Sequence, residues 1–365
     1  MRILVVRLSA LGDLVHTVPV VAALREGFPT ARIDWLVDER FQAFVELVSD
    51  VDRCIVWPRT GAGRFGRFRR VVSILRRERY DIAVDAQGLL KSAIAARLAG
   101  ASRVVGFEAS QLREPAARWF HTEHAPVVDC VHVIEKNLSL ASHLGLFTRA
   151  GAFPLSDPPT NALVKTRTSL GLTGHGGFML INPGAAWPSK RWPPAAFGAV
   201  ASRVKTELGI SSAISWGPGE RSLADAVTTL SGGAATVTPP TDIAELAGLS
   251  KGAAVVLAGD TGPLHLAAAY GTPVVALYGP SDAGRNGPWS EADIVLSRSA
   301  TCACAEEHRG AGSRGVIVRR CAEPCRCLDD IAIEEVVEAI RHRLHCRSAE
   351  RSAASVAAAR LGRSG

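Results

Sequence analysis

The segment 259–280 has the residue types and spacing of a phosphate-binding turn. An apolar run ends in Gly-Asp-Thr-Gly, Pro263 follows where a helix is expected to begin, and a second apolar run comes after it. This order predicts a strand, a glycine-rich turn, a helix and a strand. Proline suits the first helical position, and the free N–H groups of a helix start attract anions. The candidate phosphate neighbours are Asp260, Thr261, Gly262 and His265.

Two further loops carry a charged side chain where a predicted strand ends. Lys190 lies in the loop 182–193, whose glycine and prolines suit a diphosphate held by a point charge; the alternative is a solvated basic loop. Glu220 follows the next strand, where a carboxylate can bind a ribose diol or simply begin a helix. His265 can donate to a phosphate oxygen beside Asp260, although a single histidine is more often structural.

Asp13 is a candidate general base. It comes just after the first predicted strand, in the turn before a helix expected from Leu14 to about Gly27. Ligands bind at the carboxyl ends of strands in open α/β sheets, and the start of a helix favours an ionised carboxylate that can accept a proton. A helix N-cap is an equally good interpretation of Asp13 from its position alone.

Residues 59–79 hold eight arginines and a single acid, Glu78. This excess of positive charge indicates an anionic partner, because arginine pairs with phosphate and carboxylate groups through two parallel hydrogen bonds. The same segment contains two aromatic residues, Phe65 and Phe68. So few aromatic residues only weakly indicate binding of single-stranded nucleic acid. The arginines are Arg59, Arg64, Arg67, Arg69, Arg70, Arg76, Arg77 and Arg79.

Two other patterns are weaker. Gly-Ala-Gly-Arg-Phe-Gly at 61–66 matches the glycine spacing of dinucleotide binding, with Asp81 and Asp85 downstream, but arginines surround it and it does not follow the first strand. A flexible basic loop is the better interpretation. A cysteine-rich segment with His308 in it lacks the usual C-x2-C spacing of zinc sites, so reduced thiols are favoured over structural zinc. Its cysteines are Cys302, Cys304, Cys321, Cys325 and Cys327.

The composition restricts the class of protein. The 365 residues allow about two domains, and 47% of them are apolar, enough for two hydrophobic cores. The net charge of +7 favours an acidic substrate, an anionic membrane surface or nucleic acid as partner. No apolar run approaches the roughly 18 residues of a membrane span. Arg7 and Asp13 interrupt the N-terminal apolar run, so we expect a cytoplasmic protein without a signal peptide.

Short apolar runs alternate with helical patterns along the chain, which predicts an α/β fold with doubly wound parallel sheets. Residues 151–160 are rich in proline and are predicted to be a linker. We expect one Rossmann-like domain over 1–150 and a second over 161–346, facing each other across a central cleft. The tail 347–365 is rich in alanine, serine and arginine, and we expect it to be disordered.

With these residues in hand, the chain resembles the bacterial heptosyltransferases of glycosyltransferase family 9, most closely the type I members. The likeness covers nearly all of residues 1–345. Four motifs in order are specific for the family and less so for the member. They are Ser-Ala-Leu-Gly-Asp-Leu-Val-His-Thr-Val-Pro at 9–19, Asp-Ala-Gln-Gly-Leu-Leu-Lys-Ser at 85–92, the loop 182–193, and the turn 259–265 with Tyr-Gly-Pro-Ser at 278–281.

The resemblance implies a GT-B fold with an N-terminal acceptor domain and a C-terminal donor domain. The donor would be ADP-L-glycero-D-manno-heptose and the acceptor the Kdo sugar on lipid A. Asp13 matches the proposed catalytic base, Lys190 the diphosphate-binding lysine and Glu220 a ribose-binding acid. Asp260, Thr261, Gly262 and His265 match the donor motif. Family members need neither a metal ion nor a cofactor for the transfer.

Other expectations follow from the resemblance. The acceptor's phosphates and carboxylates would meet Arg64, Arg67, Arg69 and Arg70, and the protein would be a monomer, with contact to the cytoplasmic face of the inner membrane left open. Nucleic acid is not expected. Some type I members carry hydroxyl residues where this chain has Ala185 and Ala186, so backbone N–H groups would serve there.

Four alternatives stay open: a member that adds the second heptose, a sugar-nucleotide epimerase, a non-catalytic sugar-nucleotide-binding protein, and an NAD-dependent oxidoreductase. An epimerase would act on the donor alone and ignore the acceptor. A binding protein needs no base, so Asp13 together with Lys190 argues against it. The oxidoreductase depends on the weak glycine pattern at 61–66.

Overall fold

The structure of the protein is a computed structural model. It describes residues 1–58, 64–127, 130, 132–146, 151–174, 176–300, 302 and 327–346, and for residues 64 and 65 the backbone alone. The chain divides into unit 1, Met1–Pro158, and unit 2, Pro159–Gly365. The boundary lies within the segment 151–160. The expected tail 347–365 lies outside the described residues.

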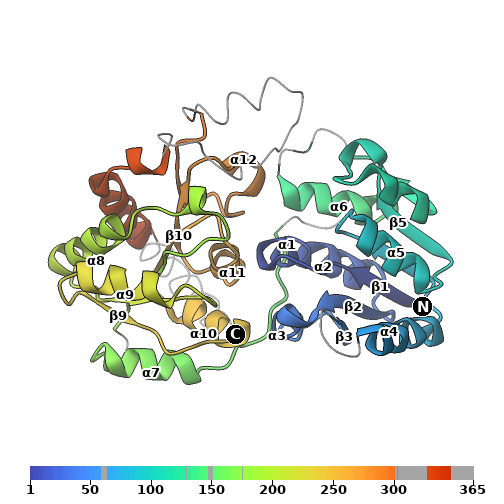
Figure 1. Ribbon diagram of the computed structural model, residues 1–365, viewed down its shortest axis with the longest axis horizontal. Helices are drawn as coiled ribbons and strands as arrows, with labels where there is room; N and C mark the ends of the chain where they lie inside the picture. The colour runs from blue at the N-terminus through green and yellow to red at the C-terminus, as the bar shows by residue number, and fades with distance from the viewer. Residues whose placement is uncertain are drawn as a thin grey trace, which may run out of the picture. The chain divides into compact units, whose positions relative to one another are not determined.

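Unit 1 contains a six-stranded sheet in the order β3-β2-β1-β4-β5-β6, with all neighbours parallel (Figure 1). The chain builds outward from β1 to one edge, returns to the centre at β4, and builds to the other edge. The inner strands are continuous buried apolar runs because helices cover both faces of the sheet. The strands are β1 (Arg2–Val6), β2 (Arg32–Asp38), β3 (Arg53–Trp57), β4 (Ile82–Asp85), β5 (Arg103–Phe107) and β6 (Glu123–Ala125).

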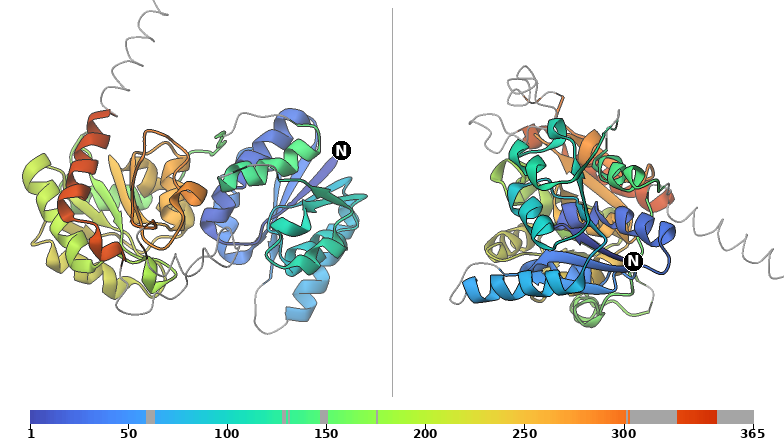
Figure 2. Two further views of the ribbon diagram at one scale, coloured as in Figure 1. Left: turned by 90° about the horizontal axis from the view of Figure 1, so that it is seen from above. Right: turned by 90° about the vertical axis from the view of Figure 1, so that its right-hand side faces the viewer.

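The helices of unit 1 form two layers. Val71 and Leu75 of α4 and Ala95 of α5 pack against Leu4 and Val6 of β1. α2 and α6 lie together on the other face (Figure 2). The α-helices are α1 (Leu11–Val15), α2 (Val18–Gly27), α3 (Gln42–Val45), α4 (Arg64–Glu78), α5 (Leu90–Leu98) and α6 (Val133–His143). Short 3-10 turns are η1 (Glu39–Phe41), η2 (Ala109–Gln111) and η3 (Pro115–Phe120).

The helix expected from Leu14 to Gly27 is in fact two helices. α1 ends at Val15 and α2 begins at Val18, with Pro19 in its first turn. Proline has no N–H to donate inside a helix but fits the first turn, so the chain breaks and restarts there. Asp13 therefore lies on a short helix of its own, directly after β1.

Unit 2 repeats the topology with the order β12-β11-β10-β7-β8-β9, again all parallel. The chain starts at β7, builds to β9, returns beside β7 at β10, and builds to β12. Both sheets thus have the doubly wound order of a Rossmann fold. The strands are β7 (Met179–Asn182), β8 (Ser212–Ile214), β9 (Ala235–Val237), β10 (Val255–Gly259), β11 (Val274–Tyr278) and β12 (Ile294–Ser297).

Helices cover both faces of this sheet as well. α8, α9 and the helix at residues 333–346 bury Phe197, Val227 and Ile340 on one face. α7, α10 and α11 bury Leu249 and Leu264 on the other. The α-helices are α7 (Asn161–Ser169), α8 (Pro194–Leu208), α9 (Arg221–Leu230), α10 (Ile243–Gly252), α11 (Gly262–Ala269) and α12 (Ala283–Asn286), with 3-10 turns η4 (Pro188–Lys190) and η5 (Cys327–Asp330). Among the described residues, no helix is both long and apolar enough to cross a bilayer.

Candidate functional site

Each sheet has a switch point, where the loops leaving two adjacent strands run to opposite sides and leave room for a ligand. In unit 2 the two strands are β7 and β10, followed by the loop 182–193 and the turn 259–262. In unit 1 they are β1 and β4, followed by segments 7–13 and 86–88. The predicted donor residues and Asp13 therefore lie at switch points, but on different units.

Lys190 and Asp260 meet at the switch point of unit 2, although 70 residues separate them. The Nζ atom of Lys190 donates to Oδ2 of Asp260, and Nε2 of His265 lies 3.4 Å from Oδ1 of the same carboxylate. The side chains of Lys190, Asp260 and His265 are only 10%, 8% and 5% exposed. Their contact follows from the sheet order, because the two loops leave neighbouring strands.

Asp260 is held in its charged form. Burial alone would raise the pKa of its carboxyl, but the hydrogen bond with His265 and the charge of Lys190 outweigh it and bring the pKa well below its usual range. Burial and the charge of Asp260 raise the pKa of the nearby Tyr278 hydroxyl, which donates to the backbone oxygen of Asn286 at 2.8 Å. Because Asp260 is charged and already contacts Lys190, a diphosphate that binds Lys190 must compete with the Asp260 carboxylate.

α11 begins two residues after Asp260 and has no side-chain cap on its first turn. Thr261 has extended backbone just before the helix, and its hydroxyl donates instead to the backbone oxygen of Gly259 at 3.2 Å. A Cβ on Gly259 would lie 2.9 Å from the backbone oxygen of Lys190, so glycine lets the two loops approach. The uncapped start of α11 therefore follows closely after the carboxylate that Lys190 contacts, and an uncapped helix start favours an anion.

Glu220 packs onto the loop that carries Lys190. Its Oε2 atom accepts the N–H of Gly217 at 2.9 Å, just before α9. A Cβ on Gly184 would lie only 2.2 Å from the same oxygen, so the carboxylate sits against the bare backbone of that glycine. The structure therefore brings Glu220 to the loop 182–193, beside the switch point.

Asp13 is held by an arginine that sequence reasoning missed. Its Oδ2 atom forms a 2.8 Å salt bridge with Nη2 of Arg7 and accepts the N–H of Ala10 at 3.3 Å. The Arg7 side chain is 10% exposed and also donates to the backbone oxygen of Ala86, after β4. Asp13 is not the N-cap of α1, a position that Ala10 occupies, and its carboxylate is 45% exposed. A signal was present: Arg7 is a lone charge at the end of a buried strand.

The motif at 85–92 supports this arrangement. Asp85 is fully buried, where its Oδ2 atom lies 2.9 Å from Nε2 of His121 and its Oδ1 atom accepts the N–H of Gln87 at 3.0 Å. Gln87 in turn accepts the N–H of Leu8 at 2.8 Å. Asp85 therefore organises the turn that holds Arg7 and is not placed to contact a ribose.

The arginines expected to bind the acceptor lie on α4. Arg67, Arg69 and Arg70 are exposed, and the side chain of Arg64 lies outside the described residues. α4 begins near the carboxyl edge of the sheet and ends at the amino edge. There Glu78 meets the first residues of three strands, at 3.5, 3.1 and 2.6 Å: Arg2, Arg32 and Arg53.

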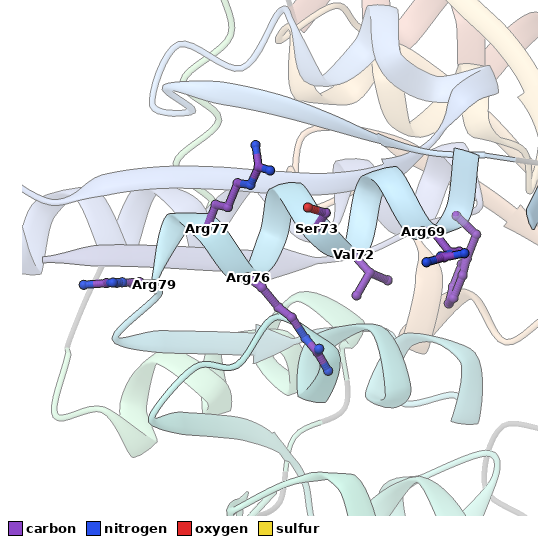
Figure 3. A pocket seen from close by; sticks show the side chains of 7 residues that line it. Arg69, Val72, Ser73, Arg76, Arg77 and Arg79 are labelled. Atoms are coloured by element: carbon purple, nitrogen blue, oxygen red, sulfur yellow. The ribbon is translucent and has the colours of Figure 1, made fainter. Parts of the chain in front are cut away.

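An open pocket of about 580 Å³ lies along α4 (Figure 3). Its lining residues are Phe68, Arg69, Val72, Ser73, Arg76, Arg77 and Arg79. Arg69 belongs to the predicted acceptor-binding group. Arg76, Arg77 and Arg79 lie at the end of α4, near the amino edge of the unit 1 sheet and away from the carboxyl edge that carries Asp13. The arginine-rich segment thus spreads along a helix rather than gathering at one site.

The cysteine-rich segment is largely outside the described residues, which include Cys302 and Cys327 but not Cys304, Cys321 or Cys325. Cys302 and Cys327 are buried. Within the described part of the chain, no group of three or more histidine, cysteine and acidic residues is arranged to hold a metal ion.

Comparison with known proteins assigns the family. The family described as glycosyltransferase family 9 (heptosyltransferase) matches residues 68–311. Lipopolysaccharide heptosyltransferase 1 of Pseudomonas aeruginosa is 31% identical over 314 residues, which make up 83% of this chain and 85% of that relative. The chain belongs to glycosyltransferase family 9. It is a glycosyltransferase of the heptosyltransferase family, which acts in biosynthesis of the lipopolysaccharide core.

Other family 9 proteins share its length and fold. Lipopolysaccharide heptosyltransferase 1 of Escherichia coli is 28% identical over 310 residues, 81% of this chain and 93% of that one. A family 9 structure from Veillonella parvula superimposes with a TM-score of 0.76 at 23% identity, covering 94% of this chain and 97% of that one. E. coli heptosyltransferase WaaC, solved with ADP, gives 0.73 at 24% identity, covering 94% and 100%. These structures show that the two Rossmann-like units form the GT-B fold.

Proposed function

We propose that this chain catalyses an inverting, metal-independent transfer of L-glycero-D-manno-heptose from ADP-heptose to the Kdo sugar of Kdo-lipid A. The names of the relatives at 31% and 28% identity support the first-heptose reaction over addition of a later heptose. The observation that carries the proposal is the buried group of Lys190, Asp260 and His265 at the uncapped start of α11. Such a site suits a nucleoside diphosphate.

On this proposal, the diphosphate of the donor lies against the first turn of α11. Lys190 exchanges Asp260 for phosphate oxygens, and the N–H groups near Gly262 donate to the same anion. Thr261 and His265 line the turn. Glu220 accepts hydrogen bonds from the ribose hydroxyls, as acids at this place in Rossmann folds do.

Asp13 acts as the general base. It accepts the proton of the acceptor hydroxyl while that oxygen forms a bond to the anomeric carbon and the bond from that carbon to the diphosphate breaks. Because attack and departure take place on opposite faces, the anomeric configuration inverts. The sugar passes through an oxocarbenium-like state, and ADP leaves with growing negative charge that Lys190 and the helix start stabilise. Arg7 holds the Asp13 carboxylate in place, and the exposed side of that carboxylate can receive the acceptor.

The acceptor is anionic, and Arg64, Arg67, Arg69 and Arg70 are proposed to contact its phosphates and carboxylates. Because the acceptor is a lipid, we propose that the enzyme works as a monomer in the cytoplasm, at the cytoplasmic face of the inner membrane.

A transfer assay with ADP-heptose and defined acceptors tests the proposal. We expect heptose on Kdo-lipid A, with the same rate in the presence of a chelator. Transfer only to an acceptor that already carries one heptose would assign the second-heptose reaction instead. Conversion of ADP-heptose that is unaffected by acceptor would indicate an epimerase, and tight binding without turnover would indicate a binding protein.

A further inference from the structure

We propose that the outer face of α4 docks the enzyme on anionic phospholipid headgroups. This inference rests on the proposed function, because a lipid acceptor requires the enzyme to work at a membrane surface. We call this surface the arginine face; it consists of Arg69, Arg76, Arg77 and Arg79 with the neighbouring Phe68, Val72 and Ser73, which together line the open pocket of Figure 3.

The charge of the arginine face is not neutralised within the protein. The one acid of α4, Glu78, turns toward the sheet and lies 2.6 Å from Arg53 and 3.1 Å from Arg32. Across the described residues, no salt bridge joins an acidic side chain to Arg69, Arg77 or Arg79. An exposed helix face with charge of one sign and no internal partner is complementary to a surface of phosphate groups.

Arg79 supplies a second observation. It follows the last residue of α4 with φ = 50°, in the left-handed region, and it is the described non-glycine residue with positive φ. Glycine is the usual residue at this position after a helix, since it has no Cβ to strain. Arg79 is exposed and lines the pocket although its backbone conformation is strained. The strain indicates that its charged side chain has a role at this position.

The shape of the face favours lipid over other anions. Single-stranded nucleic acid is bound through aromatic faces that are free to stack on bases, but the Phe68 ring packs edge-on against Trp57 at 5.3 Å between centroids. A small soluble anion needs an enclosed site with buried polar groups, whereas the arginines here are exposed. α4 has 15 residues and is about 22 Å long at 1.5 Å per residue. It therefore spans several headgroups, each of which can meet one guanidinium.

Docking through this face has a consequence for the reaction. α4 begins at the carboxyl edge of the unit 1 sheet, the edge that carries Asp13. A membrane in contact with the length of α4 would therefore reach the edge at which a lipid-borne hydroxyl has to meet the base.

The test is co-sedimentation of the full chain with vesicles. Vesicles of phosphatidylglycerol and phosphatidylethanolamine should bind the protein, and pure phosphatidylcholine vesicles should not. The double variant Arg77→Gln/Arg79→Gln should partition about tenfold or more weakly, since each basic residue near an anionic surface adds to binding. The control Lys165→Gln/Lys205→Gln removes the same two charges from exposed positions of unit 2 and should bind like the wild type.

Two further arms distinguish headgroup docking from misfolding of the variant and from binding of nucleic acid. Arg79→Gly relieves the left-handed strain, so it should raise the thermal unfolding midpoint while weakening vesicle binding, which excludes misfolding as the cause. Arg77→Gln/Arg79→Gln should keep transfer to a deacylated, soluble Kdo acceptor and lose it on vesicles that carry the acceptor. Equal vesicle binding by wild type and this variant, or tighter binding of a single-stranded oligonucleotide than of vesicles, would overturn the inference. Absence of transfer to either acceptor by the wild type would count against the proposed function, and vesicle binding would still decide the docking surface.

Discussion

Neutralising Lys190 and Asp260 one at a time separates the contribution of this ion pair to stability from its contribution to donor binding. The variants are Asp260→Asn, Lys190→Gln and the two combined. Both side chains are about one-tenth exposed, at 8% and 10%, so losing one leaves a buried charge without its partner. Breaking a buried pair costs roughly 3–5 kcal/mol. We expect each single variant to lower the unfolding free energy of unit 2 by about 3 kcal/mol, and the double variant to cost less than the sum.

Urea titration followed by tryptophan fluorescence measures these losses, because Trp187 and Trp192 lie in the loop with Lys190. Asp260→Asn should be the more costly single change, since in Lys190→Gln the carboxylate keeps its contact with His265. Losses below about 1 kcal/mol, the range of exposed pairs, or strict additivity in the double variant, would show that Lys190 and Asp260 do not form a coupled buried pair.

Calorimetric titration with ADP gives the second half of the test. Lys190→Gln should weaken ADP binding about tenfold to a hundredfold, the value of a charge-assisted hydrogen bond. Asp260→Asn should bind ADP at least as tightly as the wild type, because the diphosphate no longer competes with a carboxylate for Lys190. Equal weakening in both variants would contradict the proposed exchange of partners.

Three more predictions follow from the geometry. Hydrogen bonds from Arg103, then His143, hold the pKa of Glu123 at about 2 against an ordinary 4.5. Its stabilisation is therefore present above about pH 4.5 and lost as the pH falls toward 2; after discounting for exposure, Glu123→Gln should remove about 1 kcal/mol of the acid dependence seen in urea midpoints. Gly184→Ala would displace the Glu220 carboxylate and should weaken ADP binding about tenfold, by roughly one hydrogen bond; unchanged affinity would remove Glu220 from the ribose site. Arg7→Met should lower kcat by about tenfold to a hundredfold through misplacement of Asp13, with ADP affinity unchanged, and an unaltered kcat would show that Asp13 needs no such support.

The sequence predicted the parts of the fold that repeat a strong pattern. The alternation of short apolar runs with helical patterns predicted doubly wound parallel sheets, and both sheets have that order. The short edge strands β6 and β9 were missed because they are partly exposed and have no continuous apolar run. β12 was also missed, although it contains Ile-Val-Leu.

For the candidate site, the sequence indicated residue types but not partners. Strand-exit loops identified Lys190 and Asp260 separately, and the contact between them depends on β7 and β10 being neighbours, which no local pattern records. The charge of Arg7 at a strand end was a local signal, but its partners were not predictable, since Ala86 and Asp13 meet it only at the switch point of unit 1. The sequence suggested that the arginines of residues 59–79 form one cluster. In the structure the 15-residue helix α4 separates the first described arginine of this segment from the last.

Heptose transfer by Asp13→Asn, measured beside ADP-heptose binding, tests the role of Asp13 as the general base most directly. The control Glu39→Gln removes one exposed charge that follows β2 at the same edge of the sheet. We expect Asp13→Asn to bind the donor like the wild type and to transfer heptose at least about a hundredfold more slowly, the range for loss of a general base, while Glu39→Gln stays near normal. Near-normal transfer by Asp13→Asn would contradict the assignment of the base and, with it, the proposed mechanism.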